Sequence, residues 1–268
     1  MNAPEERASR RVPPGSDAGT SPKMMAPATQ KRNSSYFVPM QSIILLHGAL
    51  GAAQSLLPLS QALSSLADVH MLEFSGHGDA AWPEQGFTMD IFEQDVLGLM
   101  EAKGLETAHI FGYSMGGFVG LRLAKAHPHR FGSVTTLATK LDWTEETCAK
   151  EAQMLDADIL EAKAPKFIAG LSQVHTRNGW RTVMEETRRM LQRMSSYRFS
   201  PEDLAGINTR VRLIIGDRDK MVRLDETIDA FRLLPNVELA VLPGTPHPLE
   251  AADTALLSAH IGNMLSKQ

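Results

Sequence analysis

The sequence predicts an α/β fold with a doubly wound, mostly parallel sheet and one inserted helical segment. From Ser42 onward, short apolar runs alternate with longer amphipathic stretches, the pattern of strands separated by helices. A Gly-x-Ser-x-Gly pentapeptide, 112–116, stands where an apolar run meets a helical pattern. The alternation stops between about 140 and 205, where only helical spacing remains. These observations define a core and an insertion.

Six apolar runs are expected to be strands, because each is too short for a typical helix: 43–46, 69–74, 109–112, 134–137, 213–215 and 239–242. Five stretches between and after them have apolar residues at helical spacing: 53–66, 88–103, 115–126, 224–233 and 250–265. Strands joined through helices imply right-handed crossovers. The sheet should therefore be parallel and covered on both faces.

The insertion, 140–205, carries large apolar residues among many charges without a strand signal. It divides the core into 36–139 and 206–268. Such a segment can simply be a helical layer that covers the sheet. Because insertions of this kind often gate active sites, and because this one directly precedes a strand, we interpret it as a lid over a pocket.

The N-terminal segment, 1–35, is rich in Pro, Ser, Ala and Arg and has few large apolar side chains. Ordering it would cost backbone entropy without compensating burial, so we expect a disordered tail. A true start at Met24, Met25 or Met40 is one alternative, and a transit peptide is another. Acidic residues close to the N-terminus argue against the transit peptide.

The composition excludes several classes of function. The 268 residues are 43% hydrophobic and 22% charged, as in one ordinary globular domain. A net charge of -4 gives no basic surface for nucleic acid. Cys148 is the only cysteine, so neither an internal disulfide nor a zinc motif is expected. Without an apolar run of roughly 18 to 20 residues, or a signal sequence, we expect a cytoplasmic protein that does not span a membrane.

The Gly-x-Ser-x-Gly pentapeptide predicts a nucleophilic serine. Ser114 would point out of a tight strand-to-helix corner, where Gly112 and Gly116 avoid clashes that a Cβ atom would create. The serine then lies at a helix N-terminus, whose free amides and positive dipole end favour developing negative charge. The Met115 amide is a candidate oxyanion donor.

In these residues the chain resembles the α/β-hydrolase family, and the resemblance covers about 40–266 apart from the insertion. The first strand runs into His47-Gly48-Ala49, which is similar to the family's His-Gly oxyanion loop. The resemblance implies that the Ala49 amide is the second oxyanion donor. It also implies that His47 shapes the loop from beneath and does not transfer a proton in the reaction.

A serine hydroxyl needs a histidine to take its proton and a carboxylate to orient that histidine. Residues 216–222, Gly-Asp-Arg-Asp-Lys-Met-Val, resemble the family's Gly-x-x-Asp-x-x-Val acid loop, which selects Asp219. Asp217 and Asp142 are the alternative acids. His247 follows the last strand, at the place where the family has its histidine.

The resemblance implies a carboxylic ester hydrolase that forms an acyl-enzyme on Ser114 and needs no metal or organic cofactor. We expect a small-molecule substrate with a small or medium apolar acyl group, and we leave the oligomeric state open. The expected substrate-binding residues are Leu50, Trp143, Phe167, Trp180 and Met221. The same residues fit a thioesterase, a C–C bond hydrolase, a lyase, an acyltransferase or a ligand receptor without turnover, so these alternatives stay open.

Overall fold

Six parallel strands form the centre of the protein. The structure, a computed structural model, describes residues 40–266, so the tail predicted for 1–35 lies outside the described residues. The strand order is β2-β1-β3-β4-β5-β6, and each neighbouring pair is parallel. The strands are β1 (Ser42–Leu46), β2 (Asp68–Leu72), β3 (Ala108–Tyr113), β4 (Phe131–Leu137), β5 (Arg210–Gly216) and β6 (Val237–Leu242). The predicted α/β class with a parallel sheet is confirmed.

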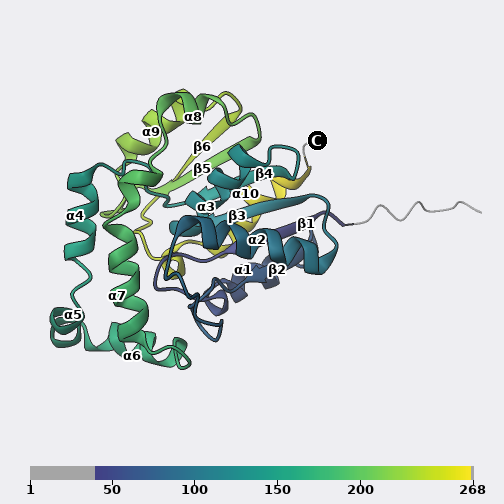
Figure 1. Ribbon diagram of the computed structural model, residues 1–268. Coiled ribbons are helices and arrows are strands. Elements are labelled where there is room, and N and C mark those ends of the chain that lie inside the picture. The colour runs from purple at the N-terminus through teal and green to yellow at the C-terminus, as the bar shows by residue number, and fades with distance from the viewer. Residues whose placement is uncertain (1–39, 267–268) are drawn as a thin grey trace, which may run out of the picture. The chain divides into compact units, whose positions relative to one another are not determined.

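The sheet is buried on both faces, which explains why its strands read as continuous apolar runs. In β1, Ile43 and Leu45 belong to one apolar cluster, whereas Ile44 and Leu46 belong to the other. The first face is covered by α1 (Leu57–Leu63) and α10 (Thr254–Ser266), and the second by α2 (Met89–Lys103), α3 (Met115–Ala126) and α9 (Leu224–Leu233) (Figure 1).

Two predicted helices are divided in the structure, each for a local reason. The stretch 53–66 splits into η1 (Ala53–Leu56) and α1, and Pro58 lies in the first turn of α1, where its missing N–H is tolerated. The stretch 250–265 splits into η3 (Leu249–Ala251) and α10. Asp253 separates the two helices, because its carboxylate accepts the amides of Ala255 and Leu256 and caps the start of α10.

The segment between β4 and β5 is helical throughout. It contains α4 (Glu145–Gln153), α5 (Ala157–Lys163), α6 (Pro165–Val174), α7 (Trp180–Leu191), η2 (Met194–Tyr197) and α8 (Pro201–Ala205). Side-chain caps start three of these helices, at Thr144, Asp156 and Ser200. Figure 1 shows α4, α5, α6 and α7 grouped together, apart from the helices that cover the sheet. No helix within 40–266 is long and apolar enough to cross a membrane.

Parallel pairing brings the carboxyl ends of the strands to one edge of the sheet. Leu46 at the end of β1 pairs with Gly112, and Tyr113 at the end of β3 pairs with Leu137. Gly216 at the end of β5 pairs with Leu242 of β6. The loops that carry the predicted site residues leave the sheet at these ends. This is the edge where open α/β sheets bind their ligands.

Candidate active site

Ser114 lies in a strained turn between β3 and α3. Its backbone has φ 50° and ψ −113°, a conformation that non-glycine residues rarely adopt. Hydrogen bonds hold it there: its N–H donates to the Leu137 carbonyl at 2.8 Å, and its carbonyl accepts from Gly117 N–H at 3.1 Å and Thr139 Oγ1 at 3.0 Å. The turn therefore directs the Ser114 side chain away from the helix it caps.

Glycines let the helix and strands pack closely around this turn. A Cβ on Gly112 would lie 2.3 Å from the Gly117 amide nitrogen, and one on Gly116 would lie 2.6 Å from the Leu46 carbonyl oxygen. Neither backbone can move aside without shifting α3 away from the sheet. Both glycines of the pentapeptide thus have the steric purpose expected from the sequence.

The loop that follows β1 passes directly beside Ser114. A Cβ on Gly48 would lie 3.3 Å from the Ser114 Cβ and 2.9 Å from the Tyr113 ring. Ala49 and Met115, the two predicted oxyanion donors, line the same cavity as Ser114. Met115 is the first residue of α3, and its N–H has no acceptor among the described residues, as is usual in a first helical turn.

His175 connects the helical insertion to the loop that carries Ala49. This side chain lies at the end of α6 and is 1% exposed. Its Nε2 is 3.0 Å from the Leu50 carbonyl oxygen, and its Nδ1 accepts a hydrogen bond from Gly78 N–H at 3.0 Å. These partners require the neutral tautomer with hydrogen on Nε2. Burial lowers the pKa of His175, which favours the same neutral form.

The contact from His175 helps to hold Leu50 in the left-handed conformation, with φ 59°. His47 supports the same loop from below, as expected: it is fully buried, donates from Nδ1 to the Gly48 carbonyl at 2.8 Å, and accepts at Nε2 from Phe74 N–H. The loop after β1 is thus held by one imidazole from the core and another from the insertion.

Asp219 and His247 form a hydrogen-bonded pair at the ends of β5 and β6. The distance from His247 Nδ1 to Asp219 Oδ2 is 2.8 Å, and the Asp219 side chain is 1% exposed. The other carboxylate oxygen accepts the amides of Met221 at 2.8 Å and Val222 at 2.9 Å. Burial acts to raise the pKa of Asp219, but the hydrogen bonds from His247, Val222 and Met221 together outweigh it and lower the pKa.

The two alternative acids have other partners. Asp142 lies 3.5 Å from an Arg198 guanidinium nitrogen and 3.9 Å from one of Arg223. Asp217 is partly exposed and lies 3.8 Å from Arg218. Only Asp219, among the carboxylates of residues 40–266, hydrogen-bonds to His247.

Ser114 and His247 line one cavity, although no hydrogen bond joins them among the described residues. Asp219 occupies Nδ1 of the imidazole, so Nε2 is the nitrogen left to receive a proton from the serine. Such hydrogen bonds often tighten only when a substrate is bound. The ring of Tyr113, the residue before the serine, lies 5.6 Å from the His247 ring and forms part of the same wall.

The cavity has a volume of about 970 Å³ and a largely apolar lining. Four of the five predicted substrate-binding residues line it: Leu50, Trp143, Phe167 and Met221. Trp180 does not; it packs against the small apolar cluster of Ile168, Leu171 and Met184. Methionines contribute much of the lining, from both the core and the insertion: Met89, Met115, Met154, Met190, Met194 and Met221.

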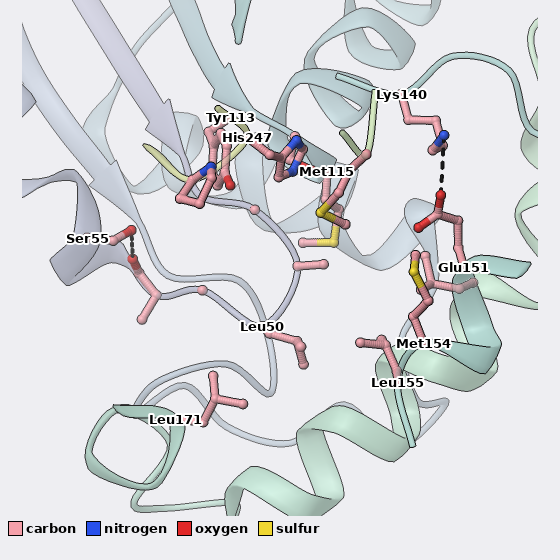
Figure 2. Close-up of a pocket in the computed structure, with 18 of the residues that line it drawn as sticks. Leu50, Ser55, Tyr113, Met115, Lys140, Glu151, Met154, Leu155, Leu171 and His247 are labelled. Atoms are coloured by element: carbon pink, nitrogen blue, oxygen red, sulfur yellow. Dashed lines mark hydrogen bonds and ion pairs between the residues drawn. The ribbon is translucent and has the colours of Figure 1, made fainter. Parts of the chain in front are cut away.

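Sequence reasoning missed a charged pair in this cavity. Lys140, just beyond β4, and Glu151, on α4, both line it, and their side chains point toward one another in Figure 2. Neither belongs to a motif, and each reads as an ordinary charge in a polar segment. The sequence likewise carries no signal that His175 reaches the loop after β1.

Metal ligands and alternative nucleophiles do not gather here. Within 40–266, no group of three or more His, Cys, Asp or Glu side chains is placed to hold a metal ion. The Cys148 thiol is buried, and burial raises its pKa, which disfavours the reactive thiolate. Among the described residues, Ser114 and His247 in the cavity, with Asp219 hydrogen-bonded to His247, therefore remain the candidate reactive groups.

Comparison with known proteins agrees with this architecture. A family described as alpha/beta hydrolase fold matches residues 41–157. The chain is 27% identical over 247 residues to a putative carbamate hydrolase, RutD, of a Caulobacter species, covering 84% of this chain and 91% of that protein. It is 34% identical over 103 residues to 3-oxoadipate enol-lactonase 1 of Acinetobacter baylyi, covering 38% of each.

Solved structures extend the likeness over most of the chain. A hydrolase from Pseudomonas aeruginosa superimposes with a TM-score of 0.71 and 16% identity, covering 85% of this chain and 91% of that one. At this identity the likeness concerns the fold.

Proposed function

Since the chain belongs to the α/β-hydrolase fold family, we propose that it is a serine hydrolase that cleaves an ester-like bond of a small or medium apolar acyl substrate. One observation carries the proposal. Ser114, in a strained turn at a helix N-terminus, shares a cavity with an imidazole that is hydrogen-bonded to a buried carboxylate. Nucleophile, base and orienting acid are the parts that acyl transfer to a serine requires.

The proposed reaction begins when Ser114 Oγ attacks the substrate carbonyl carbon and His247 Nε2 takes the hydroxyl proton. Asp219, ionised and hydrogen-bonded to Nδ1, stabilises the imidazolium that forms. His247 then protonates the leaving group, which departs and leaves an acyl-enzyme. A water molecule, deprotonated by the same imidazole, attacks the acyl carbon and releases the acid.

The amides of Ala49 and Met115 are the proposed donors to the oxyanion that develops during both attacks. Two converging N–H groups stabilise the tetrahedral intermediate more than the planar ester, and the loss of one donor typically costs about 2.7 to 4 kcal/mol. The position of Gly48 against Ser114 supports this assignment, because it brings the β1 loop to the side of the nucleophile.

The helical insertion is proposed to act as a lid. Trp143, Met154, Phe167 and Met190 come from this segment and line the cavity that holds Ser114. Opening or closing of these helices would change access to the serine and exclude water during the reaction.

An apolar substrate of moderate size fits the cavity best. Its volume of about 970 Å³ is at the upper end of the usual range for ligand pockets, and methionine side chains adapt to apolar groups of different shape. The relatives named for a carbamate and an enol lactone support hydrolysis in general without fixing the bond. Hydrolysis of an ester requires nothing beyond the serine, the histidine and the acid, which supports the proposal of an ester-like bond.

Labelling with a fluorophosphonate probe, followed by mass spectrometry of the peptide that contains Ser114, tests the nucleophile. We expect stoichiometric modification of Ser114 and turnover of esters with short to medium acyl chains. A protein that is folded by circular dichroism, yet is neither labelled at Ser114 nor active on a graded ester panel, would contradict the proposal. A ligand receptor without turnover would give that result.

A further inference from the structure

A buried ion pair forms one wall of the largely apolar cavity. The Lys140 side chain is 13% exposed and that of Glu151 is 8% exposed, with 3.3 Å between Nζ and Oε1. Figure 2 shows the pair beside Met154, with Met115 lying between it and His247. A substrate bound at Ser114 can therefore extend toward both charges without leaving the cavity.

A third charge, Glu226, contacts the same ammonium from outside the cavity. Its Oε1 lies 3.7 Å from Lys140 Nζ, and its side chain is 4% exposed. This carboxylate already accepts the amide of Arg223 at 2.8 Å at the start of α9, and the amide of Asp142 at 3.3 Å. Glu226 thus serves the backbone, whereas Lys140 and Glu151 form the buried charged pair of the cavity lining; Lys166 and Glu250, which also line the cavity, are exposed.

The geometry of the pair leaves hydrogen-bonding capacity for a ligand. Both contacts to Lys140 Nζ are longer than the about 2.7 to 2.9 Å of a charge-assisted hydrogen bond. Lys140 is also the only cation within ion-pair distance of Glu151 in the described part of the chain. An ammonium has three donors and a carboxylate two acceptor oxygens. A buried pair with this geometry contributes little to stability, since desolvation offsets its attraction.

The arrangement of the charges selects the chemistry of the group it can bind. A carboxylate that approached Lys140 would meet the negative charges of Glu151 and Glu226, and a cation that approached Glu151 would meet the ammonium. A neutral group that both accepts and donates satisfies the two side chains together. Hydroxyl and carboxamide groups have this property.

We infer that Lys140 and Glu151 determine specificity by binding a neutral hydroxyl or carboxamide group of the substrate, with Lys140 donating to it and Glu151 accepting from it. The preferred substrate is then an ester that is apolar near the reacting carbonyl and carries an uncharged polar group at one end. This inference rests on the proposed function, because the polar group reaches the pair as part of the ester that Ser114 attacks.

Two series of p-nitrophenyl and alkyl esters test the inference. In the p-nitrophenyl series the acyl chain has graded lengths and ends in methyl, hydroxyl, carboxamide, carboxylate or ammonium. In the alkyl series the alcohol portion carries the same end groups. In one of the two series we expect kcat/KM for the hydroxyl or carboxamide ester to exceed that of its methyl counterpart by about 10- to 100-fold, as for other hydrogen bonds to charged groups.

Variants assign the preference to the pair. Lys140→Met keeps the length of the side chain and removes its donors, and Glu151→Gln keeps the shape of the carboxylate and removes its charge. Each should reduce the preference to within a few-fold of unity while the methyl ester is still hydrolysed. Lys125→Met is the matched control, because its ion pair with Asp203 is exposed and lies outside the cavity. This control should keep the wild-type preference.

Urea unfolding of each variant separates a structural role from a role in specificity. If Lys140→Met does not fold, Glu151→Gln still tests the assignment. Equal kcat/KM for the methyl, hydroxyl and carboxamide esters would overturn the inference, as would a preference for carboxylate or ammonium, or a preference that both variants retain.

The inference and the proposed function fail in distinguishable ways. Absence of turnover and of Ser114 labelling rejects the hydrolase proposal. Ketone analogues, in which a methylene replaces the ester oxygen, then test the pair by calorimetry without any reaction. Tighter binding of the hydroxyl or carboxamide ketone to wild type than to Lys140→Met supports the inference, and equal binding rejects it.

Discussion

The sheet core and the helical insertion contribute to the candidate site in different ways. From the core come Ser114, Asp219 and His247, which follow the carboxyl ends of β3, β5 and β6; backbone amides and carbonyls hold Ser114 and Asp219, and Asp219 holds His247. The insertion contributes side chains that line the cavity but none of these three groups. The proposed chemistry therefore depends on backbone geometry, whereas substrate selection depends on how side chains of separate helices pack around the cavity.

Several polar contacts join the two regions, and one of the side chains that make them reaches the site. His175 extends from the end of α6 to Leu50 and Gly78 of the core. If the division between the regions holds, changes in the core should affect kcat most strongly. Changes in the insertion should affect substrate preference and KM, except at His175.

Replacing the proposed nucleophile should have the largest effect. Ser114→Ala is expected to lower kcat about 10⁴- to 10⁶-fold, because no other hydroxyl is placed to form the acyl-enzyme. Ser55→Ala is the control, since Ser55 lines the same cavity but donates to the Ala52 carbonyl. Steady-state kinetics on a reactive ester would show this contrast. Similar losses of kcat in both variants would mean that Ser114 is not the nucleophile.

Replacing the proposed acid should have the next largest effect. Asp219→Asn is expected to lower kcat about 10³- to 10⁴-fold, because the amide cannot stabilise the imidazolium and favours the wrong tautomer. Asp217→Asn, two residues away and partly exposed, should stay within a few-fold of wild type. Kinetic comparison of the two variants tests the choice of acid, and a larger loss at Asp217 would reverse it.

His175 tests whether the insertion reaches the chemistry. His175→Ala should lower kcat about 10-fold or more with little change in KM, since loosening the Leu50 loop weakens an oxyanion donor without removing it. His109→Ala is the control, because His109 is also partly buried and hydrogen-bonded, to Ser133, but lies outside the cavity. An equal fall of kcat in both variants would mean that His175 contributes to stability in general and does not support the oxyanion donor.

Because the pKa of His175 is lowered, the contribution of this contact to stability depends on pH. Its folded-state pKa lies below the unfolded value of about 6.5, so its contribution to stability is present above that pH and is lost as pH falls through the folded pKa. The difference in unfolding free energy between wild type and His175→Ala should therefore shrink from neutral pH to about pH 5. Urea titrations at both pH values measure it, and a difference that grows in acid would contradict the assigned tautomer.

Two tryptophans of the insertion give the smallest contrast. Trp143 lines the cavity, so Trp143→Ala should raise KM for an apolar ester by about 10-fold. Trp180 does not line the cavity and packs against the small apolar cluster of the insertion, so Trp180→Ala should lower stability and leave KM within about twofold. A larger rise in KM for Trp180→Ala than for Trp143→Ala would show that the cavity lining differs in solution.

Prediction from sequence succeeded best where local pattern fixes the structure. The six strands lie where they were predicted, although β4 and β5 each begin three residues earlier, and the helices 115–126 and 224–233 have the predicted bounds, because apolar periodicity and glycine positions report directly on burial and turns. The acid could be chosen only by resemblance, and the hydrogen bond from His247 to Asp219 now distinguishes it from Asp217. Trp180 was expected in the cavity because periodicity cannot tell which apolar faces meet.

Apolar periodicity and glycine spacing were enough to predict the strands, the α/β class and the position of the turn at Ser114, since these signals are local. The contact of His175 with the loop of Leu50, more than a hundred residues earlier, and the position of Lys140 and Glu151 inside an apolar cavity are visible only in the folded chain. Contacts between distant segments depend on how whole helices pack. No local pattern of charge or hydrophobicity encodes that packing, which therefore had to be observed.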